Sequence, residues 1–126
     1  MTPIAAEWLQ EAEEDYGVAQ WIATGPTAAF NAICFHCHQC VEKSLKCRLQ
    51  EAAVPLAKTH DLEVLLDAVL PVELGWASLR PQLKFLRPFS TETRYPGVSA
   101  SADDAREVLQ ICTAVRRTMR GSMGLV

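Results

Sequence analysis

Seven prolines divide this 126-residue chain into segments of helical length. Proline fixes φ and lacks a backbone N–H, so a helix tolerates it in the first turn but ends or kinks at it further in. Two prolines stand where a first turn is expected, and four follow an apolar segment: Pro3 and Pro81 in the first group, Pro26, Pro55, Pro71 and Pro88 in the second. Between them, apolar residues recur at helical spacing, and no stretch is a convincing strand. The pattern predicts an all-α chain.

Capping residues and helix breakers set the expected boundaries. Thr2 before Pro3 begins the first helix, and Gly25 before Pro26 ends it. Either Thr59 or Asp61 is a natural N-cap for the third helix. We therefore expect helices over residues 2–24, 28–53, 59–70, 78–87 and 101–120, the last opened by a capping box. This is a bundle of four to five helices, and the length of 126 residues fits one domain.

The second expected helix is apolar on more than one side. Its main stripe comprises Phe30, Cys34, Cys37, His38, Val41, Leu45, Leu49 and Ala52. Ile33, Cys40 and Cys47 lie on the flank and far side. A helix of this kind is either central or faces a partner subunit. Within the stripe, His38 is interpreted as a hydrogen-bonded interior histidine.

Charge is distributed unevenly along the chain. Residues 1–42 hold six acidic residues and no Lys or Arg, whereas residues 43–126 hold twelve basic and nine acidic residues. The net charge of −3 disfavours a general nucleic-acid binder but leaves room for one small anion or one acidic partner.

Cysteine usage indicates a reduced, cytoplasmic protein. Five cysteines, an odd number, occur without a secretory signal or an apolar run that could span a membrane. Cys34, Cys37 and Cys40 resemble a metal motif, but on a helix Cys40 is rotated by roughly 240° from Cys34. We interpret these cysteines as small buried apolar residues and expect no metal site and no cofactor.

Basic side chains gather at three places. Lys43 and Lys46 share a face of the second helix; Arg80, Lys84 and Arg87 share a face of the fourth; and Arg94 precedes Tyr95 in a loop. Two solvated helix faces are the simpler interpretation of the first two groups. The loop pair offers a guanidinium beside a stacking ring, a pairing suited to a phosphate and its nucleobase.

Four motifs, in order, resemble the HEPN (higher eukaryotes and prokaryotes nucleotide-binding) domain family. They are the segment 8–16 on the first helix, the segment 35–47 on the second, Thr59-His60-Asp61-Leu62, and Thr93-Arg94-Tyr95-Pro96. The resemblance spans about residues 5–120. It implies an up-and-down four-helix bundle with a short additional helix, often a homodimer, in a prokaryotic cytoplasmic protein.

The resemblance also implies a partner. Many HEPN proteins are encoded beside a minimal nucleotidyltransferase and form a two-component, toxin–antitoxin-like system with it. Another branch comprises ribonucleases whose signature is an arginine followed, after four to six residues, by a histidine. That signature is absent here, because eleven residues separate Arg48 from His60 and no arginine precedes the other histidines.

The sequence therefore predicts a non-catalytic HEPN-domain protein that binds a nucleotide, a nucleotidyltransferase partner, or both. The candidate binding residues are Lys43, Lys46, His60, Asp61, Arg94 and Tyr95. One alternative is a homodimeric interaction module without a small ligand. Another is a ribonuclease toxin that lacks the usual motif, which would depend on His36 or His60. RNA and membranes are not expected partners.

Overall fold

The computed structural model describes residues 1–91 and 96–125 of the chain. Within these residues the structure is all-α and contains no strand. The elements are α1 (Pro3–Thr24), α2 (Phe30–Glu51), α3 (Leu62–Val69), η1 (Leu74–Leu79), α4 (Arg80–Leu86), η2 (Arg87–Phe89) and α5 (Ala102–Ser122). The predicted all-α, up-and-down bundle with a short additional helix is confirmed.

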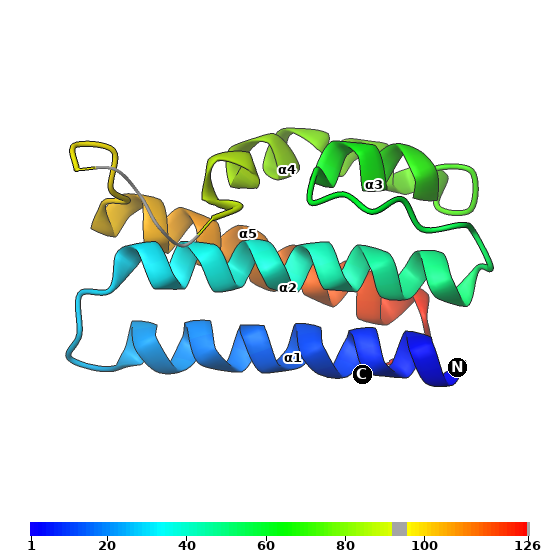
Figure 1. Cartoon of the computed structure of the whole chain (residues 1–126), viewed down its shortest axis with the longest axis horizontal. Helices are drawn as coiled ribbons and strands as arrows, with labels where there is room; N and C mark the ends of the chain where they lie inside the picture. Colours follow the sequence, from blue (N-terminus) through cyan, green and yellow to red (C-terminus); the bar gives the residue numbers. More distant parts are fainter. Residues whose placement is uncertain (92–95, 126) are drawn as a thin grey trace.

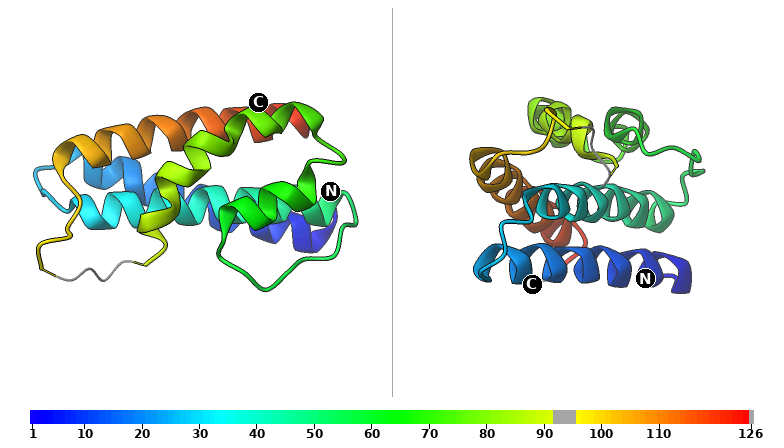
Figure 2. Two further views of the ribbon diagram at one scale, coloured as in Figure 1. Left: turned by 90° about the horizontal axis from the view of Figure 1, so that it is seen from above. Right: turned by 60° about the vertical axis from the view of Figure 1, so that its left-hand side comes forward.

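Helix α2 occupies the centre of the bundle. Helices α1 and α2 run antiparallel, α3 and α4 cover α2 on the side opposite α1, and α5 runs behind α2 in the same direction (Figure 1). The turned views in Figure 2 show α5 and the α3–α4 layer on different sides of α2. Twelve of the 22 residues of α2 are buried, spread over most of the circumference of the helix. Its two-sided apolar pattern is therefore explained by cover from within the chain.

Helix beginnings follow the predicted capping chemistry. The Thr2 hydroxyl accepts a hydrogen bond from the backbone N–H of Ala5 at 3.1 Å, with Pro3 at the first helical position. Asp61, rather than Thr59, caps α3. Ser101 and Asp104 form the expected capping box, each side chain accepting the other residue's backbone N–H at 3.0 Å. Such caps satisfy backbone donors that the first turn leaves without helical partners.

The end of α2 comes two residues earlier than predicted. Ala53 adopts φ of 57°, in the left-handed region. The Val54 N–H donates to the Leu49 carbonyl at 3.0 Å, and the Ala53 N–H donates to the Gln50 carbonyl at 3.1 Å. This pair of bonds is a Schellman motif, which usually has glycine at the left-handed position. The hydrogen bonds end the helix before Pro55 can.

The five cysteines are all buried in the core, as expected for packing residues. Their exposures are 0% for Cys34, Cys37, Cys47 and Cys112 and 1% for Cys40. Hydrogen bonding with the thiols of Cys37 and Cys40, together with burial, raises the pKa of Cys112 well above its ordinary value. Within residues 1–91 and 96–125, no group of three or more His, Cys, Asp or Glu residues could hold a metal ion.

A membrane-spanning helix must be both long and strongly apolar. None of the described helices is both long enough and apolar enough to cross a bilayer.

Candidate functional site

The buried carboxylate of Glu42 lies at the centre of a polar cluster on α2. Its side chain is 3% exposed. The Lys46 ammonium donates to it at 3.0 Å, and His60 Nδ1 lies 2.9 Å from the same oxygen. Burying a carboxylate is costly unless it is paired and hydrogen-bonded, and both conditions are met here. Glu42 thus ties the segment 52–61, between α2 and α3, to the centre of the bundle.

His38 lies one turn before Glu42 and is 1% exposed. Its Nδ1 is 3.9 Å from the nearer Glu42 oxygen, which is too long for a hydrogen bond. Neither ring nitrogen has a hydrogen-bond partner within the described part of the chain. The expectation of an interior histidine is correct, but the expectation of a hydrogen-bonded one is wrong. Burial lowers the pKa of His38, and the nearby Glu42 carboxylate only partly opposes that shift.

A pocket of about 390 Å³ opens beside this cluster. It is lined by Trp8, Lys46, Leu56, Ala57, Lys58, Thr59 and His60. The Lys46 ammonium sits over the Trp8 ring, 5.2 Å from its centroid. The wall therefore combines two ammonium groups, an imidazole and an indole, contributed by α1, α2 and the segment 52–61. These groups are suited to a phosphate and a flat ring.

Two predicted residues meet in this pocket, and a third stands beside it. Lys46 and His60 both line it. The Asp61 carboxylate accepts backbone N–H groups of Glu63 at 3.0 Å and Val64 at 3.4 Å. It is committed to capping α3 and to holding the entry of that helix next to His60.

Lys43 belongs to a different network. Its ammonium donates to Asp15 of α1 at 2.8 Å, and His36 Nδ1 lies 2.8 Å from the other oxygen of that carboxylate. Burial alone would lower the pKa of Lys43, but the hydrogen bond to Asp15, aided by Glu11, raises it. Lys43 and Lys46, which share a face of α2, are therefore held by different carboxylates, Asp15 and Glu42. Lys43 joins α1 to α2.

Arg80, another cation singled out in the sequence, does not line the pocket. Arg80 of α4 is paired with Glu63 and Asp67 of α3. Arg94 and Tyr95 lie outside the described residues.

Sequence reasoning missed three contributors. None of Trp8, Lys58 and Glu42 is among the candidate binding residues. Glu42 could have indicated the site, because a glutamate among the buried positions of a central helix needs a cationic partner. Lys46, four residues after Glu42 on the same helix, is one partner of this carboxylate, and His60, from outside the helix, is another.

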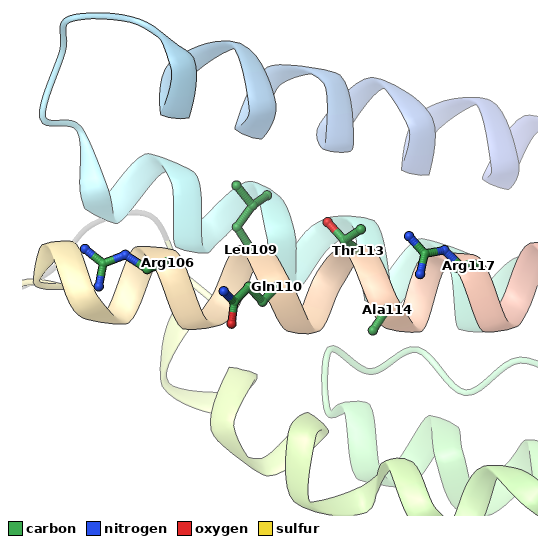
Figure 3. Close-up of a pocket in the computed structure, with 6 residues that line it drawn as sticks. All are labelled: Arg106, Leu109, Gln110, Thr113, Ala114 and Arg117. Atoms are coloured by element: carbon green, nitrogen blue, oxygen red, sulfur yellow. The ribbon is translucent and has the colours of Figure 1, made fainter.

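A second hollow, of about 460 Å³, runs along α5. It is lined by Arg106, Leu109, Gln110, Thr113, Ala114 and Arg117, which Figure 3 shows along this one helix. Because a single helix supplies every lining residue, a small ligand there would remain largely exposed. The pocket between Trp8 and His60 encloses a ligand better and is the stronger candidate.

The fold and this pocket define a small helical-bundle domain with a cation- and aromatic-lined site on its side. The sequence matches the HEPN domain family over residues 5–122, and the chain therefore belongs to that family. A crystal structure of ST0689, an archaeal HEPN homologue, is similar, with a TM-score of 0.72 and 25% sequence identity. The similarity covers 94% of this chain and 96% of that one. No protein of curated function matches the sequence.

Proposed function

We propose that this HEPN protein binds a nucleotide in the pocket between Trp8 and His60, without catalysing a reaction itself. The observation that carries the proposal is that Lys46, Lys58 and His60 line one pocket together with the indole of Trp8. In this arrangement the ammonium groups and the imidazole contact phosphate oxygens, and the indole packs against the base. Glu42 holds Lys46 and His60 in place at distances of 3.0 and 2.9 Å.

The charges of the pocket support a single anionic ligand. Glu42 offsets the charge of Lys46, whereas exposed Lys58 extends the cationic wall toward solvent. Asp61 occupies the N-terminus of α3, so that helix end is not available to a phosphate. Side chains therefore make the contacts, and Lys58 is the cation whose removal disturbs the fold least.

Titration of the purified protein with ATP and with GTP tests the proposal. A ligand that binds the folded state raises the melting temperature in proportion to RT ln(1 + [L]/Kd), so millimolar nucleotide raises it measurably. Lys58→Ala should reduce this shift, whereas Lys84→Ala, at an exposed lysine of α4, should leave it intact. The absence of any shift, or equal loss in both variants, would contradict the proposal.

We further propose that the protein acts with a minimal nucleotidyltransferase in a toxin–antitoxin-like pair, since HEPN proteins commonly pair with such enzymes. Co-expression with a nucleotidyltransferase encoded beside it, followed by size-exclusion chromatography, tests this pairing. Co-elution in a fixed ratio is the expected result, and separate elution of the two proteins would contradict it.

The α5 hollow in Figure 3 favours a second candidate, an interaction module that forms homodimers without a small ligand. Replacement of Ala114, which is exposed in this hollow, by Arg should then disrupt the dimer in sedimentation experiments. A wild-type chain that sediments as a monomer at all concentrations would rule this candidate out.

A further inference from the structure

The outward side of α1 carries apolar and acidic side chains together. We call this surface the α1 outer face and define it by Ile4, Glu7, Glu11, Glu14, Val18 and Trp21, which are all exposed. Trp21 is 78% exposed, Ile4 55% and Val18 38%. Single exposed apolar residues are ordinary, but a tryptophan of this exposure on the same helix face as two other apolar side chains is typical of an interaction surface.

The face has a hollow near its N-terminal end. Ile4, Glu7, Trp8 and Glu11 line this hollow of about 200 Å³. Of these four residues, only Trp8 also lines the nucleotide pocket. Apolar walls with two carboxylates suit a lysine or arginine side chain, whose stem packs on Ile4 and Trp8 while its charge meets Glu7 and Glu11.

Charge decides which kind of occupant this face accepts. Residues 1–42 contain no Lys or Arg, so the acids of the outer face have no basic neighbour on their own helix. Glu11 lies 3.8 Å from the Lys43 ammonium of α2, which Asp15 binds more closely at 2.8 Å. The other acids of α1 point inward, where Glu13 pairs with Arg116 and Arg120 of α5 and Asp15 pairs with Lys43 of α2. A nucleic acid or an anionic membrane would be repelled, and two copies packed through this face would oppose their own carboxylates.

We propose that the α1 outer face binds a basic, amphipathic helix of a partner protein. A Lys or Arg of that helix enters the hollow at Glu7 and Glu11, and an apolar side chain covers Trp21 and Val18. Glu7 and Trp21 are fourteen positions apart. This separation corresponds to ~21 Å along the axis, so the partner helix must span about four turns. The proposal is independent of nucleotide binding.

A pair of synthetic peptides tests this inference on the full chain. The first is a helical peptide about 18 residues long, or ~27 Å, with leucine on one face and lysine on the other. The second carries glutamate in place of lysine. Fluorescence anisotropy of each labelled peptide should show that only the lysine peptide binds, and that its affinity falls as salt rises.

Variants of the protein test whether the lysine peptide binds at the α1 outer face. Trp21→Ala should weaken the lysine peptide about tenfold, as loss of a central aromatic contact does. Glu7→Gln with Glu11→Gln should weaken it roughly fivefold, as expected for two partly exposed ion pairs. Matched controls remove an exposed apolar residue elsewhere, Leu74→Ala, and two exposed acids of α5, Asp103→Asn with Glu107→Gln. Both controls should bind like the wild type.

Three results would overturn the inference. Equal weakening in the control variants would show that the peptide binds the acidic protein without a defined site. Binding of the glutamate peptide would show that charge does not select the occupant. Concentration-dependent self-association that Trp21→Ala abolishes would show that the occupant is a second copy of this chain. Because none of the variants removes a residue of the nucleotide pocket, nucleotide binding should persist in all of them.

Discussion

At the scale of single residues, the main feature is how α2 accommodates polar side chains in a buried helix. Glu42 and Lys46 are 2% and 8% exposed, and each has a charged partner. His38 is buried to the same degree without a hydrogen bond within the described residues. A buried polar atom that lacks a partner costs about 1–3 kcal/mol, so His38 weakens the fold where it stands.

Replacement of His38 by Met should therefore preserve or raise stability, by about 1 kcal/mol at neutral pH. The pKa of His38 is lowered in the folded state from an ordinary value of 6.5, so the unfolded chain takes up the proton more readily. The wild type should then lose stability as pH falls through and below 6.5, and His38→Met should flatten that decline. Urea unfolding at pH 7.5, 6.5 and 5.5 measures both effects; identical slopes for the two proteins would contradict the assignment.

At the scale of elements, local sequence rules account for helix beginnings better than for helix ends. Thr2, Asp61 and Ser101 stand at caps because their short side chains accept backbone N–H groups. The end of α2 was predicted too late because proline was taken as the breaker. Alanine at a left-handed position carries no sequence signal that it will end a helix.

A substitution at Ala53 tests whether backbone strain is present where α2 ends. An alanine at φ of 57° is strained relative to glycine, which adopts the left-handed region freely. Ala53→Gly should stabilise the protein by about 0.5–1 kcal/mol. Chemical denaturation measures the change, with Ala52→Gly as the matched control because Ala52 has φ of −85°. That control should be neutral or destabilising; equal stabilisation by both variants would exclude relief of backbone strain as the cause.

At the scale of the whole molecule, the bundle could be predicted from apolar spacing and helix breakers, but the site could be predicted only in part. Sequence placed Lys46 and His60 at one site, and the structure brings both to one pocket. It also grouped Lys43 with Lys46, and the structure pairs each of them with a different carboxylate. A helical wheel gives the direction of a side chain but not which carboxylate on another helix will reach it. Trp8 and Lys58 were missed for the same reason, because they approach Lys46 from other segments.

The packing of the core predicts how the thiols of the entire chain react. All five cysteines carry thiols rather than disulfides and are at most 1% exposed. Burial also raises the pKa of Cys47, which further suppresses its reactive thiolate form. A thiol reagent should therefore modify the native protein only at the rate of unfolding, and five thiols should react at once in guanidinium. Fast reaction of one thiol in the native protein would show that the core opens locally.

The order of helices around α2 has a consequence for how the chain folds. Helices α1 and α2 are joined by residues 25–29 alone, so they meet by closing a short loop. Helix α5 reaches α2 only after residues 52–101 have been traversed, and Arg116 finds Glu13 across 103 positions of sequence. Contacts between distant segments slow folding, because the intervening chain loses conformational entropy before the contacts can stabilise it. We expect the α1–α2 hairpin to form early and the docking of α5 to set the folding rate.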